Sequence, residues 1–414
     1  MNGLRGLASL HVVLTHIFHG IQIDLMSSAI LGLFYMLSGF LLTVSFCQKP
    51  LRISRSEDFP SYSGDAIYAR FVSMVPGLRN GTGQEHQKGD TSVIGGWSFF
   101  KRRLQRLLPV YYVGNIIGAL ANHLGASHFM MNGTSLRHLI LTVLGATSWF
   151  PPMLPMGSLV TWSVSTMIPF YFIYPAIAPL IQNVDRSKLF NLAVKMYLIQ
   201  GSWMLFCIIM FLVPPRDFWR WYFWSRNPPP MRLPVFIMGC CAGMEHLHRL
   251  NDEKTNCEKA TRQSANWEFI KCFTPILMGV IIGMSGDDNE CYELDIGFCF
   301  DNGLVRMLLE ALMPILYYDL ILALVNPVGD CGNPSWFLNL CNSKFLQFVG
   351  EISYSLLVVH FTVYVTMKFV TEFRAQIIPP TIFLSIFGGW LMYRFYEKPM
   401  VSYLHRSGQK GKKA

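Results

Sequence analysis

Long apolar segments recur along the chain from its first residues almost to its last. Most have roughly the 17 to 25 residues that a helix needs to cross a bilayer, and polar loops separate them. The pattern predicts an all-α protein, a polytopic transmembrane bundle of about ten to eleven helices. The candidate segments are Leu4–Asp24, Ile30–Cys47, Val110–Leu124, Leu136–Phe150, Leu159–Ile181, Leu189–Val213, Leu233–His248, Phe269–Met284, Leu304–Val325, Leu346–Val370 and Thr381–Tyr396.

Composition supports an integral membrane protein. Of the 414 residues, 52% are hydrophobic and only 14% are charged, whereas a soluble domain carries roughly 25% charged residues. The first apolar segment begins at Leu4 with no basic stretch before it, so we expect a retained helix and not a cleaved signal peptide. Residues 1–414 are therefore expected to form one membrane domain, multi-pass in an endomembrane or the plasma membrane.

The distribution of charge suggests an orientation. The net charge is +9, and the positive-inside rule explains it without a nucleic acid as partner. The loop that ends at Arg106 and the tail 400–414 are basic, whereas Asp287–Asp301 holds six acids and no base. We predict that both termini and a polar insert at 48–100 are cytoplasmic. Ten full spans fit this orientation, with Leu136–Phe150 re-entrant or interfacial.

Local motifs qualify this picture. Asn132 opens an Asn-Gly-Thr sequon in a predicted lumenal loop and is a possible glycosylation site, whereas the sequon at Asn80 falls in the predicted cytoplasmic insert. The three arginines of Arg216–Arg226 conflict with the orientation, since they fall outside. The ten cysteines show no paired CxxC spacing, so no metal site is expected.

The first apolar segment carries the clearest candidate chemistry. Arg5 and His16 are eleven residues apart, which brings them to nearly the same helix face with an axial separation of about 16 Å. This geometry suits a molecule with phosphates at one end and a reactive group at the other, such as an acyl-CoA. Neutral imidazole is a suitable base for an attacking hydroxyl. The alternative is that His16 only hydrogen-bonds a neighbouring helix.

A second basic set precedes the next span. Arg103 and Arg106 are one helical turn apart and point the same way. Guanidinium groups bind phosphate in a bidentate manner, so both are candidate donor-binding residues. The alternative is an ordinary positive flank of a membrane helix.

Other polar residues in apolar segments are candidates for the acceptor site or its cavity, because charged groups in a membrane are costly. Arg232 either holds a phosphate or extends to the interface. Ser353 and His360 share a helix face, and Glu351 lies on the opposite side from His360. Glu310 forms either a structural ion pair or part of an acceptor site.

The joint order of these motifs resembles the acyltransferase 3 family of membrane-bound O-acyltransferases over nearly the whole chain. The resemblance rests on Asn2–Ala8 with His16, Phe34–Thr43, Arg103–Pro109, Thr161–Ser165, Met231–Phe236, Gly350–Leu356 with His360, and Glu397–Pro399. It implies about ten spanning helices, a catalytic base at His16, donor binding by Arg103 and Arg106, and acyl-CoA as co-substrate with no tightly bound cofactor. Asn2 stands where many members have Asp, and Met167 stands where many have Glu. The loss of the Glu carboxylate is expected to change acceptor recognition more than donor use.

These observations predict an enzyme, an acyltransferase for groups other than aminoacyl groups. It would move an acyl group, with acetyl expected, from acyl-CoA to a hydroxyl of a small metabolite or glycan. Arg5, Arg103 and Arg106 would hold the CoA phosphates, and His16 would deprotonate the acceptor. The alternatives are a covalent acyl-enzyme route, a secondary transporter or exporter of an acidic metabolite, and a catalytically silent membrane scaffold.

Overall fold

A computed structural model of the chain describes residues 1–18, 25–52, 55–74, 92–93, 95–123, 136–150, 157–213, 218–253, 265–285, 300–325, 335–371 and 375–410. Asn80, Asn132 and most of the predicted acidic loop lie outside these residues. The α-helices are α1 (Asn2–Phe18), α2 (Ser27–Phe46), α3 (Gly64–Ser73), α5 (Gly96–His123), α6 (Leu136–Val143), α7 (Trp162–Gln182), α8 (Arg186–Leu212), α9 (Phe218–Arg226), α10 (Pro229–Glu253), α11 (Ala265–Ser285), α12 (Phe300–Val325), α13 (Trp336–Cys341), α14 (Lys344–Thr371), α15 (Ile378–Met392) and α16 (Lys398–Lys410).

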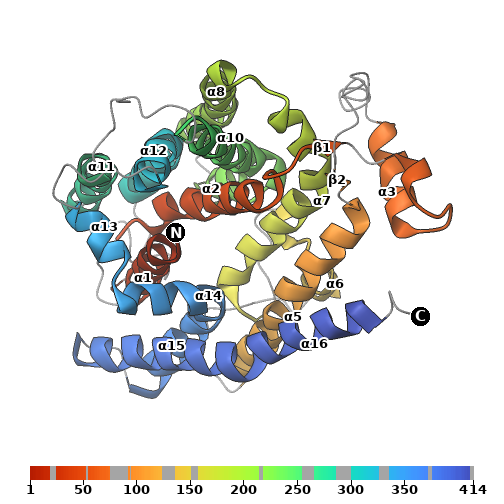
Figure 1. The fold of residues 1–414 in the computed structure, drawn as a ribbon. Coiled ribbons are helices and arrows are strands. Elements are labelled where there is room, and N and C mark those ends of the chain that lie inside the picture. Colours follow the sequence, from red (N-terminus) through yellow and green to blue (C-terminus); the bar gives the residue numbers. More distant parts are fainter. Residues whose placement is uncertain are drawn as a thin grey trace.

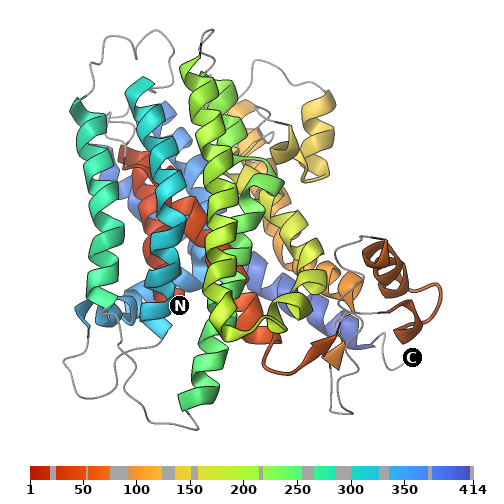
Figure 2. The same ribbon diagram turned by 90° about the horizontal axis from the view of Figure 1, so that it is seen from above.

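Short elements complete the described chain. Single 3₁₀ turns are formed by Ser56–Asp58, Thr147–Trp149, Leu159–Thr161 and Ala375–Ile377, and Tyr393–Glu397 is a π-helical turn. The strands β1 (Leu51–Arg52) and β2 (Ser92–Val93) pair in parallel. The long helices run side by side, with α1 and α2 enclosed among them, and α3 stands at the side of the bundle (Figures 1 and 2).

Six helices in the described ranges combine the length and apolar composition needed to cross a membrane. They are formed by Ala29–Phe46, Trp162–Gln182, Arg186–Leu212, Ala265–Ile282, Gly303–Val325 and Lys344–Val370. The protein is therefore a helical integral membrane protein, but the predicted ten to eleven spans are not confirmed. Helix α6 has only 8 residues, about 12 Å of helix, which is too short to cross a bilayer.

Close packing of α1 on α14 depends on two glycines. A Cβ atom on Gly6 would lie 2.3 Å from the carbonyl oxygen of Leu346, and one on Gly350 would lie 2.0 Å from the carbonyl oxygen of Asn2. Only glycine permits such backbone contact, as in other membrane helix pairs. Two motifs from opposite ends of the sequence therefore lie against each other, and the side chains of α1 and α14 meet further along the pair.

The insert 48–100 contains a docked helix that the sequence pattern did not predict. The Tyr68 hydroxyl of α3 donates to the carbonyl oxygen of Phe172 in α7 at 2.7 Å. Asp65 of α3 accepts hydrogen bonds from the amide and the hydroxyl of Ser98, at the start of α5, at 2.9 and 2.5 Å. Tyr68 and Val72 are buried against Ala176. Helix α3 is thus tied to the flank of the bundle.

Candidate active site

Two histidines from α1 and α14 form the centre of the candidate site. His16 is partly buried, His360 is fully buried, and His16 Nδ1 lies 3.1 Å from His360 Nε2. The ring centroids are 5.1 Å apart. Phe361 presents its ring edge-on to His16 at 5.4 Å. His16, the predicted base, therefore faces α14. The helix face that Ser353 and His360 were predicted to share is the one that contacts α1.

The backbone assigns protons to this histidine pair. His16 Nδ1 lies 3.0 Å from the carbonyl oxygen of Val12, and His360 Nδ1 lies 3.2 Å from that of Leu356. Because a carbonyl can only accept, each neutral ring carries its hydrogen on Nδ1. In this tautomer His360 Nε2 accepts from His16 Nδ1, and the basic nitrogen of the His16 ring is Nε2.

A second polar contact joins the same two helices at the other end of α1. Arg5 Nη2 donates to Ser353 Oγ at 2.8 Å. Ser353 is buried on α14, on the face that also carries His360. Arg5 and His16 are eleven positions apart, which gives an axial distance of about 16 Å. The structure therefore places a guanidinium and an imidazole at two levels along one helix interface.

Glu397 adds a carboxylate near Arg5. It is buried and accepts from Ser355 Oγ at 2.6 Å, and it ends the π-helical turn Tyr393–Glu397. Such turns are frequent at functional sites. Arg5 and Arg106 both interact electrostatically with Glu397 and with each other. Sequence reasoning assigned no role to Glu397, although the Glu-Lys-Pro segment had marked its position.

The other donor-binding candidates converge on the same end of the bundle. The Arg103 guanidinium lies over the rings of Phe46 and Phe99, 5.6 and 5.3 Å from their centroids. Tyr171 interacts electrostatically with both Arg103 and Arg5. Arg106 is exposed. Helix α5 thus brings two further guanidinium groups to the region of Arg5.

The remaining candidates separate from this group. Glu351 is exposed, because it lies on another face of α14 from Ser353 and His360. Arg232 is 1% exposed and pairs with Glu310. The interpretation of Arg232 as a residue that extends to the interface is wrong, because the cation is held inside the bundle by a carboxylate from α12. Among the described residues no three His, Cys, Asp or Glu side chains gather as a metal-binding group.

The fold and this site define a class of protein, a membrane-embedded helical bundle with a histidine pair in its interior. The profile of an acyltransferase domain matches residues 1–394, and the chain belongs to this acyltransferase 3 family. It is therefore an acyltransferase that transfers groups other than aminoacyl groups. No curated protein and no solved structure matches the chain.

Proposed function

We propose that the protein is an acyl-CoA-dependent O-acyltransferase with His16 as its general base. The observation that carries the proposal is the α1–α14 interface, which presents Arg5 and His16 at two levels and orients His16 through His360. A guanidinium suits the phosphates of CoA, and an oriented neutral imidazole suits proton abstraction. The two groups match the two ends of an acyl-CoA.

The donor would bind at the end of the bundle where Arg5, Arg103 and Arg106 converge, which we take to be the cytoplasmic end. Their guanidinium groups would hold the phosphates of CoA. The pantetheine arm would extend along α1 toward His16 and bring the thioester carbonyl beside the acceptor. Glu397, which interacts electrostatically with Arg5 and Arg106, would keep these cations in place in the absence of donor.

The transfer step would use the proton arrangement of the histidine pair. His16 Nε2 takes the proton of the acceptor hydroxyl as the oxygen attacks the thioester carbonyl. The resulting imidazolium is stabilised because its Nδ1 hydrogen is already donated to His360 Nε2 and the Val12 carbonyl. Collapse of the tetrahedral intermediate breaks the carbon–sulfur bond, and the leaving thiolate takes the proton from His16. The acceptor would be a hydroxyl of a small metabolite or glycan, and acetyl the expected group.

The test is transfer by the purified protein. Detergent-purified protein is incubated with acetyl-CoA labelled in the acetyl group and a metabolite extract, and free CoA thiol and labelled product are measured. We expect both, and we expect His16→Ala to lower their rate by about 10² to 10⁴. His11→Gln is the matched control, because His11 lies on another face of α1 and its Nε2 meets the carbonyl of Leu25 at 2.7 Å.

The outcome separates the alternatives. A transporter would give neither CoA release nor labelled product, and a silent scaffold would be unaffected by His16→Ala. A label that remains on the washed protein would favour the covalent acyl-enzyme route. Transfer at the same rate in His16→Ala and the unmodified protein would refute the proposed role of His16.

A further inference from the structure

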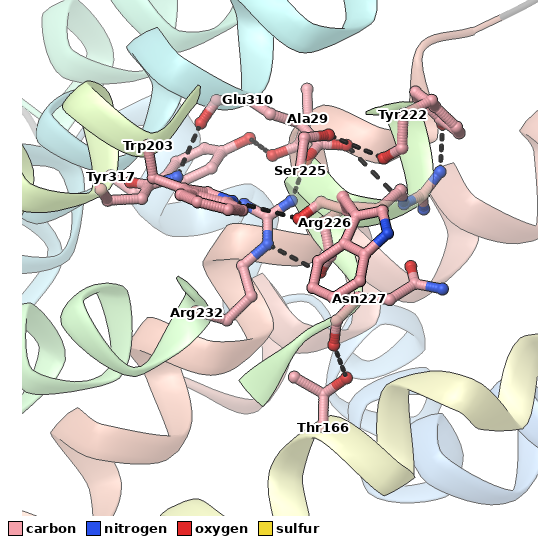
Figure 3. Close-up of polar contacts among 12 residues, drawn as sticks. Ala29, Thr166, Trp203, Tyr222, Ser225, Arg226, Asn227, Arg232, Glu310 and Tyr317 are labelled. Atoms are coloured by element: carbon pink, nitrogen blue, oxygen red, sulfur yellow. Dashed lines mark hydrogen bonds and ion pairs between the residues drawn. The ribbon is translucent and has the colours of Figure 1, made fainter. Parts of the chain in front are cut away.

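A second charged cluster is buried where α9 meets α10. Arg226 ends α9, and Arg232 lies in the first turns of α10. The side chains of Arg226, Arg232 and Glu310 are 13%, 1% and 1% exposed. Figure 3 shows these groups between the helices of the bundle. Ionisable groups at such positions in a membrane protein are expensive and mark functional sites.

The two arginines share one carboxylate among the described residues. Arg232 is paired with Glu310 and also donates from Nε to the carbonyl oxygen of Arg226 at 3.0 Å. Arg226 Nε lies 3.9 Å from Glu310 Oε1, beyond hydrogen-bonding distance. Arg306 adds further positive charge to the surroundings of Arg226. Arg232 thus has a strong anionic partner, whereas Arg226 has only a weak one.

Aromatic groups hold Arg226 instead. Its guanidinium lies 4.9 Å from the centroid of Trp162 and 4.8 Å from that of Tyr222, and it donates to the Tyr222 hydroxyl. These contacts orient a cation without neutralising it. An anion that entered beside Arg226 would therefore find a positioned guanidinium with most of its charge uncompensated.

The same junction contains buried polar atoms that are unpartnered among the described residues. Asn227 is 0% exposed, and neither Oδ1 nor Nδ2 of its amide has a hydrogen-bond partner among the described residues. Arg226 Nε and Glu310 Oε1 also lack one. Figure 3 shows the Asn227 amide and the Arg226 guanidinium extending to the same side of the junction. Since buried polar groups are nearly always hydrogen-bonded, these donors and acceptors suit an oxygen-rich ligand.

The cluster is connected to the histidine site through one short segment. Val160 packs against the apolar group that contains Val13, Ile17 and Phe361, the residues around His16. Two residues further along the chain, the Trp162 ring makes the cation–π contact with Arg226. The segment is also tied to α14, because Ser158 Oγ donates to the carbonyl oxygen of Val358 at 3.2 Å. The start of α7 therefore links the surroundings of Arg226 to those of His16, and a ligand at Arg226 would approach the histidine site from this side.

We propose that Arg226, Asn227 and Trp162 form a subsite for an anionic group, a carboxylate or phosphate, on the hydroxylated acceptor. This inference rests on the proposed function, because it names the acceptor class for the same transfer. Arg226 and the Asn227 Nδ2 donate to the anion, and Glu310 keeps Arg232 from competing for it. The anion belongs either to a water-soluble hydroxy acid or phosphate ester, or to the headgroup of an acidic lipid.

The test measures binding and does not require turnover. The thermal unfolding midpoint of the full-length protein is followed in uncharged detergent with malate or glycerol 3-phosphate, and in nanodiscs of phosphatidylcholine with and without phosphatidylglycerol. We expect one of these probes to raise the midpoint. Stabilisation by malate or glycerol 3-phosphate indicates a soluble acceptor, and stabilisation by phosphatidylglycerol alone indicates a lipid.

Asn227→Asp places a carboxylate beside Arg226 and should occupy the subsite from within, so the response to the anion should be lost. Arg226→Lys keeps the charge but loses bidentate donation, and should weaken binding about tenfold or more. Arg220→Gln, an exposed arginine of the same helix, is the control and should respond like the unmodified protein. Should Asn227→Asp fail to fold, Arg226→Lys decides the question.

Two results would overturn the subsite. One is the absence of a response to every probe in the unmodified protein, and the other is an equal response in the unmodified protein, Asn227→Asp and Arg226→Lys. The proposed function fails separately. Anion binding without CoA release would support the subsite and refute the proposed acyl transfer. CoA release without a response to any anion would support the acyl transfer and refute the subsite.

Discussion

The orientation of His16 by His360 leads to a quantitative prediction. His360→Leu removes the Nε2 atom that accepts from His16 Nδ1 at 3.1 Å. In the ground state this is a hydrogen bond between neutral groups, worth about 1 kcal/mol, and in the transition state His16 is an imidazolium, for which the bond is worth about 2 to 3 kcal/mol. The difference of about 1 to 2 kcal/mol lowers kcat about 5- to 30-fold.

The assay is initial-rate CoA release over a range of acyl-CoA and acceptor concentrations. We expect kcat to fall in His360→Leu while KM for acyl-CoA stays unchanged, because His360 is a positioning residue and the donor phosphates bind elsewhere. His360→Gln should recover most of the activity, since its side-chain oxygen can accept from His16. A merely structural role would not produce this split or this recovery.

Two results would refute the reasoning. Unchanged kcat in His360→Leu, with His16→Ala inactive, would show that His16 needs no orienting partner. A loss as large as that of His16→Ala would show that His360 itself carries the proton, since a positioning residue contributes less than the base that it orients. Size-exclusion profiles and unfolding midpoints of the variants must match the unmodified protein for either comparison.

Other variants test the fold and the donor site. Gly6→Ala should destabilise the protein by about 1 to 3 kcal/mol, because its Cβ would lie 2.3 Å from a backbone carbonyl of α14; Gly201→Ala, with nothing within 4 Å, is the control and should not lower the unfolding midpoint. Arg106→Gln should raise KM for acyl-CoA more than kcat falls, with a smaller salt dependence of KM than the unmodified protein; an unchanged KM would remove Arg106 from the donor site. Tyr68→Phe removes the 2.7 Å hydrogen bond from α3 to α7 and should cost about 1 kcal/mol, visible as faster proteolysis of the insert; equal cleavage rates would contradict the docking of α3.

Much of the candidate site follows from spacing along single helices. Because an α-helix turns by about 100° per residue, eleven residues place Arg5 and His16 on nearly one face. The same argument put Arg103 beside Arg106, and Ser353 on the face of His360 with Glu351 away from it. Each of these statements needs only the regular geometry of a helix. The family assignment likewise followed from the order of motifs in the sequence.

Sequence reasoning could not name the partners of these residues. His16 meets His360 across 344 positions, and Arg232 meets Glu310 across 78. Apolar segments of similar composition do not specify which helix packs on which. The count of ten to eleven spans stays a prediction, because apolar composition does not fix how long a helix becomes, as the 8 residues of α6 illustrate.

The sequence by itself determined that the chain is a helical membrane protein and which residues share a helix face, because burial in lipid and the helical repeat act on each segment alone. The tertiary structure decided that Gly6 and Gly350 bring α1 against α14, and that Arg226 and Arg232 share the carboxylate of Glu310. Those outcomes depend on backbone contacts and buried charges between segments far apart in the chain. Their free energies arise only when the helices pack.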